Sequence, residues 1–424
     1  MRTDQVFGIS PEIRDTSYVD RGELDSKLEK ALQRTKHIAI RGPSKSGKSW
    51  LRQRVVDNAI VVQCRLHKSF IDIYVDALSQ LDIKLTISES RTGSVKGSIK
   101  ASGSLGVQLL GKIGIDVQGE VSSSDQTTDK VIGKDIEDLR FIAEILKASE
   151  RRLIIEDFHY MSTENRKGFA FDLKALWDYS VFVLIVGVWS QTNLLLHLNP
   201  DLSGRVEEIP VDWSNPDLKE IIDRGENILN LFIADAVKGK LVELAYGNAG
   251  VLQQLALLTL DQADIEEKRF LKQELNDINH VDSAAMEYAE QLNPVYQQFS
   301  KLVSSGIRSR KNSTGIYAHA MDAIIDSTDD ELTNGLSAKT IYDKAHNRQD
   351  RIQFGNLKII LEKLPELQVD QDGRGMVITY NSATEEISVV DRQLLLYRRF
   401  STVKWPWEDL IAEAEKAGGQ LDSD

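Results

Sequence analysis

The chain has 424 residues, 41% hydrophobic and 28% charged, a composition typical of a soluble globular protein of two or three domains. Its formal net charge of -13 argues against a broadly basic nucleic-acid binder, although a local basic patch stays open. The only cysteine, Cys64, excludes an internal disulfide framework and favours a reducing, cytoplasmic location. No signal core follows the first residues, and no run approaches the ~18 apolar residues of a membrane span.

The first predicted helix begins near Leu24, because Leu24, Leu28, Ala31 and Leu32 recur at helical spacing. The segment before it reads Tyr-Val-Asp-Arg-Gly-Glu-Leu over residues 18–24. One interpretation of this stretch is a plain amphipathic helix. The other is a short sequence motif before a helix, called a box, that lies beside a bound nucleotide.

Residues 42–49 read Gly-Pro-Ser-Lys-Ser-Gly-Lys-Ser and match the phosphate-binding P-loop pattern. An apolar run at 37–40 predicts a strand before it, and residues from 50 onward predict a helix after it. This context favours a phosphate loop over a chance match in an ordinary turn. The glycines allow backbone N–H groups to converge on phosphate oxygens, while Lys48 reaches the β- and γ-phosphates and Ser49 holds Mg2+. The predicted nucleotide-binding residues here are Gly42, Ser44, Lys45, Ser46, Gly47, Lys48, Ser49 and Trp50.

Residues 89–134 interrupt the alternation of strands and helices that begins with the strand at 59–65 and the helix at 71–81. Glycines recur between residues that largely alternate apolar and polar, which predicts an insertion of one or two β-hairpins. The insertion has several possible roles: pairing with a neighbouring subunit, binding a partner, or forming a flap. Lys96, Lys100 and Lys112 argue against a membrane-active segment.

A second apolar run, which begins at Leu153 after two arginines, predicts a buried strand that ends in Glu156 and Asp157. Carboxylates at the carboxyl end of such a strand lie beside the phosphate loop, where parallel sheets bind ligands. We assign Glu156, with Ser49, to the magnesium ion and Asp157 to the catalytic base that polarises the attacking water. Two solvated acids at a strand end are the alternative. His159, two residues later, is interpreted as structural.

The order of these features resembles that of AAA+ ATPases of the origin-recognition type and of the related STAND signalling ATPases. The resemblance covers residues 7–263, with a looser likeness over 331–400. It implies an α/β P-loop ATPase core with a parallel sheet, ATP and magnesium as cofactors, and oligomers whose ATP sites lie between subunits. Two residues depart from the family pattern: Asp20 replaces a glycine, and Glu156 precedes Asp157 where the family usually has Asp first.

The resemblance also implies roles for residues further along the chain. The strand at 181–189 leads to Ser190 or Gln191, either of which takes the place of a polar sensor near the γ-phosphate. Arg205 matches an arginine that reaches into the neighbouring subunit's ATP, although a lone arginine in a polar loop is also an ordinary surface residue. Gly250 stands where the family's lid has a phosphate-sensing arginine, so nucleotide-dependent closure of the lid is in doubt.

The region from 331 onward predicts two helices, at 338–345 and 354–364, followed by a hairpin of strands at 376–380 and 386–390. This order resembles a winged helix, which binds DNA through its second helix. That helix carries only two basic residues, Lys358 and Lys363, balanced by Glu362. Contact with a partner protein is therefore as reasonable an expectation as contact with DNA.

We predict an ATPase core at 1–213, a helical lid at 214–300, a linker at 301–330, a winged-helix-like domain at 331–410 and a tail at 411–424. The first functional hypothesis is a slowly hydrolysing regulatory ATPase that switches homo-oligomeric assembly with a partner protein, with a bacterial defence system as one setting. The alternative is a DNA-binding loader or transposition-type regulator. A nucleotide-binding subunit without turnover and a metabolic kinase are further alternatives.

Overall fold

The structure is a computed structural model, and it describes residues 1–65, 68–89, 95–114, 136, 138–189, 192–305, 315–368, 376–382 and 384–419. The chain forms two compact units. Unit 1 contains Met1–Gly22, Gly42–Gly47 and Val211–Asp424, and unit 2 contains Glu23–Arg41 and Lys48–Pro210. The predicted sensor, Ser190 or Gln191, and most of the predicted insertion lie outside the described residues.

Unit 2 is built on a five-stranded sheet with the order β2-β5-β6-β1-β7. All four neighbouring pairs are parallel, which confirms the predicted α/β fold class with a parallel sheet. The strands are β1 (His37–Arg41), β2 (Ala59–Gln63), β5 (Arg152–Glu156), β6 (Leu184–Gly187) and β7 (Val206–Pro210). Because the strands are parallel, the residues that follow their carboxyl ends share one edge of the sheet.

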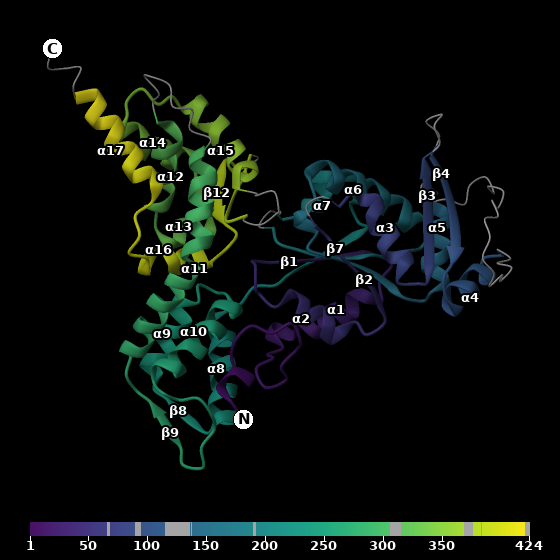
Figure 1. The fold of residues 1–424 in the computed structure, drawn as a ribbon, viewed down its shortest axis with the longest axis horizontal. Helices are drawn as coiled ribbons and strands as arrows, with labels where there is room; N and C mark the ends of the chain where they lie inside the picture. Colours follow the sequence, from purple (N-terminus) through teal and green to yellow (C-terminus); the bar gives the residue numbers. More distant parts are fainter. Residues whose placement is uncertain are drawn as a thin grey trace. The chain divides into compact units, whose positions relative to one another are not determined.

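Helices cover both faces of this sheet, as Figure 1 shows. On one face lie α1 (Leu24–Leu32) and α2 (Lys48–Val55), and on the other lie α3 (Phe70–Ser79), α5 (Leu139–Ala148) and α6 (Thr163–Asp178). Ala39 belongs to the core under α3, α5 and α6, whereas its neighbours Ile38 and Ile40 point to the opposite face and are also fully buried. Burial on both faces explains why the strands read as continuous apolar runs.

The described part of the insertion is one hairpin and one helix. Strands β3 (Ile83–Glu89) and β4 (Val95–Ala101) pair antiparallel, so the hairpin begins before the predicted boundary at 89. The prediction of strand structure around Val107 was wrong, because α4 (Ser104–Lys112) occupies this stretch. Its buried residues are Gly106, Leu109 and Leu110, whose spacing is helical. Unit 2 also contains the short helices η3 (Phe158–Tyr160), α7 (Leu194–Leu198) and η4 (Pro200–Leu202). The short helix η2 (Arg21–Glu23) begins in unit 1 and leads into α1.

Unit 1 begins with η1 (Thr3–Gln5), which packs on the predicted lid. The lid consists of α8 (Asn215–Leu229), β8 (Leu231–Ile233), α9 (Asp235–Leu244), α10 (Ala249–Gln262) and β9 (Gln273–Leu275), with β8 and β9 parallel. Phe7 is fully buried against α8, where a Cβ atom at Gly225 would lie 2.1 Å from its ring. The amino terminus is therefore an integral part of the lid's core.

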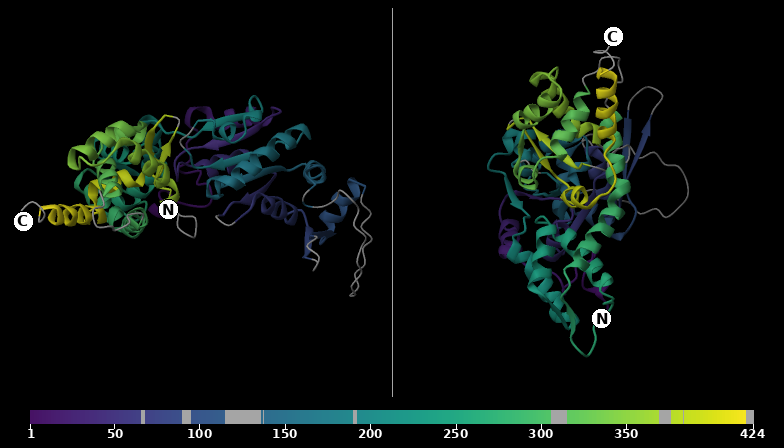
Figure 2. Two further views of the ribbon diagram at one scale, coloured as in Figure 1. Left: turned by 90° about the horizontal axis from the view of Figure 1, so that it is seen from above. Right: turned by 90° about the vertical axis from the view of Figure 1, so that its left-hand side faces the viewer.

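The remainder of unit 1 is mostly helical. It contains α11 (Asn279–Ser305), α12 (Ile316–Ile325), α13 (Asp329–Asn334), β10 (Leu336–Ser337), α14 (Ala338–Arg348), α15 (Phe354–Gln368), β11 (Ile378–Asn381), β12 (Glu386–Val389), α16 (Gln393–Phe400) and α17 (Pro406–Gly419). The three strands form an antiparallel sheet in the order β10-β12-β11. Helix α17 runs outward from this group of helices in each view (Figures 1 and 2). α12 lies within the predicted linker at 301–330.

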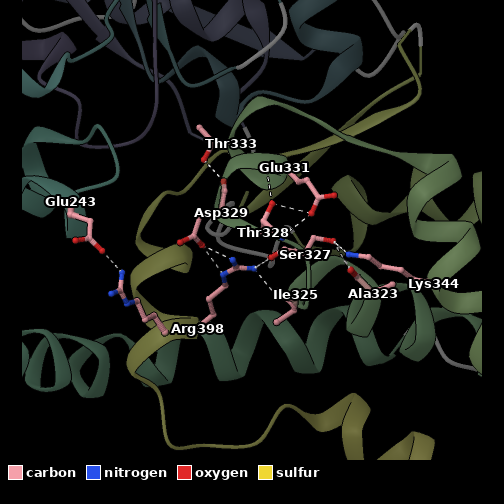
Figure 3. A network of polar contacts seen from close by, with 11 residues as sticks. Glu243, Ala323, Ile325, Ser327, Thr328, Asp329, Glu331, Thr333, Lys344 and Arg398 are labelled. Atoms are coloured by element: carbon pink, nitrogen blue, oxygen red, sulfur yellow. Dashed lines mark hydrogen bonds and ion pairs between the residues drawn. The ribbon is translucent and has the colours of Figure 1, made fainter.

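Helix α16 connects several elements of unit 1 through its two arginines. Arg398 donates from Nε to Asp329 Oδ1 at 3.1 Å and from Nη1 to the Ile325 carbonyl at 2.7 Å (Figure 3). Arg399 donates to Glu243 Oε1 on α9 at 2.7 Å. One hydrophobic core extends through the lid and these C-terminal elements, so α16 is held on both sides. Within the described part of the chain, no helix combines the length and apolar character needed to cross a bilayer.

Candidate functional site

The predicted phosphate loop connects β1 to α2, as the sequence context requires. The contacts of Gly42–Gly47 place these residues in unit 1, whereas Lys48 and Ser49 open α2 in unit 2.

In unit 2, Glu156 ends β5 and its side chain meets the first turn of α2. Glu156 Oε2 accepts a hydrogen bond from Ser49 Oγ at 3.2 Å, and Oε1 accepts one from Arg52 Nε at 2.9 Å. Glu156 is only 4% exposed, so Arg52 compensates a charge that is withdrawn from water. The hydroxyl and the carboxylate that we predicted as the magnesium ligands thus lie side by side.

Asp157 follows Glu156 and turns away from the strand in the left-handed region, with φ +54°. Its carboxylate accepts a hydrogen bond from Gln63 at the end of the neighbouring strand β2. Burial raises the pKa of Asp157 and nearby Glu156 adds to the shift, whereas Lys48 and the Gln63 hydrogen bond oppose it. An aspartate whose pKa is raised in this way is a better proton acceptor than a solvated one, as a catalytic base requires.

Two other polar groups beside these carboxylates have structural roles. His159 Nδ1 accepts a hydrogen bond from the Val188 backbone at 3.2 Å, which joins the loops after β5 and β6. Burial lowers the pKa of His159 to about 3, with smaller contributions from Lys48 and Arg166, so the ring is neutral at physiological pH. Cys64 is buried and its pKa is raised to about 12 by burial, so the thiol is unreactive.

Arg205, which the resemblance predicts to reach a neighbouring subunit's ATP, lies just before β7. Its carbonyl accepts a hydrogen bond from the backbone N–H of His37, the first residue of β1. It is therefore at the amino end of the strands, whereas Glu156 is at the carboxyl end. The guanidinium stacks 4.8 Å from the centre of the Trp177 ring and donates to the Asp201 carbonyl. Within its own subunit, Arg205 does not join the carboxylates, so the predicted role requires a neighbouring subunit.

In unit 1, three consecutive carbonyl groups of the loop accept hydrogen bonds from the lid and its flanks. Asn248 Nδ2 donates to the Ser44 carbonyl at 2.7 Å, and the Gly250 backbone donates to the Lys45 carbonyl at 3.0 Å. The Ser46 carbonyl accepts from Trp213 Nε1 at 2.8 Å. These contacts fix the loop's carbonyl groups on one side.

Arg21 supports the same loop from the segment that resembles the family's box. Its guanidinium lies 4.1 Å from the centre of the Trp213 ring, and Nη2 donates to the Ser46 carbonyl at 3.3 Å. Gly47, with φ +84°, lies against Arg21, since a Cβ atom there would be 3.7 Å from Nη2. Arg21 thus supports the phosphate loop by contacting Ser46 and Gly47. The sequence does not reveal this role.

The loop residues fit a phosphate group. Ser46 is fully buried, and among the described residues its Oγ has no hydrogen-bond partner. No hydrogen bond from the backbone amides of Lys45, Ser46 and Gly47 occurs within the described ranges. A Cβ atom at Gly42 would lie 2.7 Å from the Val211 carbonyl, so only glycine fits there. A buried polar group without a partner, such as Ser46 Oγ, is costly, and phosphate oxygens would satisfy both this hydroxyl and the loop amides.

The packing of Lys45 against Gly250 leaves no room for a side chain at position 250. Lys45 adopts φ +61°, and a Cβ atom at Gly250 would lie 2.5 Å from the Lys45 Cβ. A side chain at Gly250 is therefore excluded by the close approach of the two backbones. The Lys45 ammonium donates instead to Gln393 Oε1 on α16 at 2.7 Å. Desolvation lowers the pKa of Lys45, and Asp391 opposes this shift.

Lys48 and Trp50 are the remaining predicted nucleotide-binding residues. Lys48 is buried at the start of α2, and Trp50 is half-buried in the same helix. In the described part of the chain, no group of three or more histidine, cysteine, aspartate or glutamate side chains is arranged to hold a metal ion. The pair of Ser49 and Glu156 is nevertheless what magnesium needs, because this ion usually takes one or two protein oxygens, phosphate oxygens and water. Trp213, Asn248 and Gln393 were not predicted.

Comparisons with known proteins give fold likeness only. No family model matches the chain, and no curated protein matches it. Solved structures with a similar arrangement include the Orc1 protein of Aeropyrum pernix in complex with DNA, with 12% identity, a TM-score of 0.38 and coverage of 92% of this chain and 94% of that one. Cdc6p of Pyrobaculum aerophilum has 12% identity, a TM-score of 0.36 and coverage of 97% and 98%. The RuvB Holliday junction branch migration motor of Thermotoga maritima has 12% identity, a TM-score of 0.35 and coverage of 77% and 87%. All three TM-scores are below 0.5, so the fold class rests on the strand order and pairing above.

Proposed function

We propose that the protein is an ATP-binding, slowly hydrolysing ATPase of the AAA+ type. The observation that carries the proposal is the pair formed by Ser49 and Glu156, 3.2 Å apart, at the carboxyl end of β5 and the start of the helix that follows the phosphate loop. A hydroxyl and a carboxylate in this relation, next to a phosphate-binding lysine, are the protein's share of a magnesium–nucleotide site. The bound magnesium ion would neutralise charge on the β- and γ-phosphates.

The residues of the chain divide the work of hydrolysis. Lys48 would bind the phosphates, Ser49 and Glu156 would hold the metal ion, and Asp157 would accept a proton from the attacking water. Gln63 orients the Asp157 carboxylate. We infer slow turnover, because Arg205 stacks on Trp177 and does not join the carboxylates within its own subunit.

Equilibrium binding tests the first half of the proposal. Titration calorimetry with ADP and with a non-hydrolysable ATP analogue, with and without magnesium, should give saturable binding to the wild-type protein. Lys48→Ala should lose most of that affinity, whereas Lys174→Ala, a lysine paired with Asp178 on the surface of α6, should not. If Lys48→Ala bound nucleotide as tightly as the wild type, the phosphate loop would not be the nucleotide-binding site.

Turnover tests the second half. Asp157→Asn should bind nucleotide normally and lose hydrolysis by about 10²- to 10⁴-fold, the usual contribution of a general base. Asp178→Asn is the matched surface control. Hydrolysis that survives in Asp157→Asn would favour the alternative in which the protein binds nucleotide without turnover for a structural purpose.

We further propose that ATP switches assembly into a homo-oligomer with a partner protein. Particle masses from mass photometry, without nucleotide and with ADP or ATP plus magnesium, should rise to a defined oligomer only with ATP. Lys48→Ala should keep the nucleotide-free mass under every condition. A constant mass throughout the series would contradict ATP-driven assembly, because a ligand shifts an equilibrium only through its preference for one state.

DNA binding through α15 remains a second proposal with weaker support. Lys358, one of its two lysines, donates to Glu385 Oε1 at 2.5 Å, so its charge is already compensated. The exposed face of α15 also carries Ile359, which is 52% exposed and suits a protein partner better than a phosphate backbone. Salt-dependent retention of a DNA duplex, lost in Lys358→Glu, would favour the DNA-binding alternative.

A further inference from the structure

The phosphate loop carries a second lysine whose ammonium group is held by a distant part of the same unit. Lys45 Nζ donates to Gln393 Oε1 at 2.7 Å, across 348 positions of sequence. Lys45 also remains exposed to solvent, so a ligand can reach it. Its backbone lies in the loop segment whose amides have no backbone acceptor within the described ranges.

Gln393 has its hydrogen-bonding capacity filled by this arrangement. The same Oε1 atom accepts from the Tyr288 hydroxyl at 2.6 Å, and Nε2 donates to Asp391 Oδ1 at 3.0 Å. Asp391 is fixed in turn by the Tyr296 hydroxyl at 3.0 Å. Gln393 is 5% exposed, so its amide cannot turn to find other partners without breaking buried hydrogen bonds. The acceptor offered to Lys45 is therefore preorganised.

The lid cannot provide a phosphate-sensing side chain at Gly250, because the backbone of Lys45 occupies that space. The ammonium of Lys45 is then the cation of unit 1 that extends from the phosphate loop itself. Its hydrogen-bond acceptor is a neutral amide, which holds an ammonium less firmly than a carboxylate does, and Asp391 attracts it without a direct hydrogen bond. A terminal phosphate carries full negative charge and would compete for this ammonium.

Helix α16 connects that amide to the C-terminal elements. Gln393 is its first residue, and Arg398 near its end donates to Asp329 at the start of α13 and to the Ile325 carbonyl at the end of α12 (Figure 3). A displacement of α13 or of the adjoining elements would therefore move the acceptor of Lys45. Helix α16 therefore contacts the phosphate loop through Gln393 and the C-terminal elements through Arg398.

We propose that Lys45 is the residue that makes the protein prefer a nucleoside triphosphate over a diphosphate, and that Gln393 weakens this preference by holding the ammonium group away from the phosphate. The inference rests on the proposed nucleotide-binding function and specifies its selectivity. Lys45 contacts the ligand, whereas Gln393 is a positioning residue that acts through Lys45. A partner that moves α16 would raise the affinity for ATP without touching the phosphate loop.

The test compares dissociation constants for ADP and for a non-hydrolysable ATP analogue, with magnesium, in full-length variants. Lys45→Met should weaken binding of the ATP analogue about tenfold or more, as for loss of a charged hydrogen bond, and change ADP binding by less than about twofold. Gln393→Met should tighten binding of the ATP analogue severalfold. In Lys45→Met, the second substitution Gln393→Met should have no further effect, because the two residues act together. Lys45→Arg should retain the preference.

Matched controls separate selectivity from folding. Lys339→Met removes a surface lysine that pairs with Asp343 on α14, and it should bind both nucleotides as the wild type does. Thermal unfolding of every variant shows whether it is folded, and Lys45→Arg keeps the test valid if Lys45→Met is unstable.

Each remaining outcome has one meaning. The role of Lys45 would be overturned if Lys45→Met lost affinity for ADP and for the ATP analogue equally, or if the effects of the two methionine substitutions were additive. The proposed function would remain in place. A wild-type protein that binds neither nucleotide, or binding that survives in Lys48→Ala, would overturn the proposed function itself.

Discussion

Gly250 donates its backbone N–H to the carbonyl of Lys45 at 3.0 Å, and its α-carbon approaches so closely that an added Cβ would lie 2.5 Å from the Lys45 Cβ. This contact joins the first turn of α10 to the phosphate loop. The geometry excludes a side chain at position 250, whatever its charge. Packing against Lys45 therefore accounts for the glycine at this position.

Gly250→Ala should destabilise the protein by about 1–3 kcal/mol, since an extra methyl group must push the loop or the helix aside. It should also weaken nucleotide binding, because Lys45 and Ser46 would move. Gly239→Ala on α9 is the control, since a Cβ there meets nothing within 4 Å. That change should be neutral or stabilise by about 0.4–1 kcal/mol. Chemical denaturation measures both, and an unaffected Gly250→Ala protein would mean that the loop tolerates displacement.

Removal of the Glu156 charge should separate a structural role from a metal-binding role. Glu156→Gln leaves Arg52 without its ionic partner in a nearly buried position, which typically costs about 3 kcal/mol or more. Arg52→Gln in the same protein should recover part of that stability. Neither variant should show magnesium-dependent nucleotide binding, because Ser49 alone remains. Restored magnesium dependence in the double variant would assign the metal to another carboxylate.

The stability of unit 2 should fall below neutral pH because of His37. This ring is fully buried, accepts from the Val183 backbone at 2.9 Å and bonds the Leu173 carbonyl at 2.8 Å. Burial lowers its pKa to about 4, so between pH 6.5 and 4 the unfolded chain binds more protons than the folded one. Stability is complete above pH 6.5 and is lost as the pH falls toward 4, by about 2 kcal/mol at pH 5.

Urea denaturation across this pH range measures the effect. His37→Asn should be less stable at neutral pH but show a shallower decline with acid, whereas His197→Asn, at an exposed position, should follow the wild type. His159 has a pKa lowered in the same direction, so the double variant His37→Asn/His159→Asn should give the flattest profile. An acid profile unchanged by His37→Asn would place the acid-sensitive group elsewhere.

Mixing experiments should reveal whether Arg205 acts on a neighbouring subunit. Lys48→Ala and Arg205→Ala should each hydrolyse ATP poorly alone, but a mixture should regain activity if Lys48→Ala subunits supply Arg205 to intact phosphate loops. Arg205 must leave the Trp177 ring to do this, at a cost of about 0.5–1 kcal/mol at a partly exposed site. A mixture no more active than its components would restrict Arg205 to its contact with Trp177.

The sequence was informative where a function depends on neighbouring positions in the chain. The phosphate loop and the strand ending in Glu156 are local patterns, and the buried strands on either side of them have the predicted type. The stretch around Val107 was misread because short apolar alternation and helical spacing coexist there, and Leu109 and Leu110 pack as a helix does. Asn248 and Gln393 contact the loop across more than 200 positions of sequence, a pairing that no single-sequence pattern encodes.

Helix α11 has mechanical consequences that follow from its length and from one residue. Its 27 residues span about 40 Å, with Tyr288 in the first half and Pro294 near the middle. Proline has no N–H to donate to the carbonyl four residues earlier, so the helix is most easily bent at that point. A bend of about 10° at Pro294 would carry the last turn sideways by about 3 Å, given the 1.5 Å rise per residue. The protein thus contains a lever whose pivot lies two residues from Tyr296 and whose longer arm carries Tyr288, whose hydroxyl donates to Gln393.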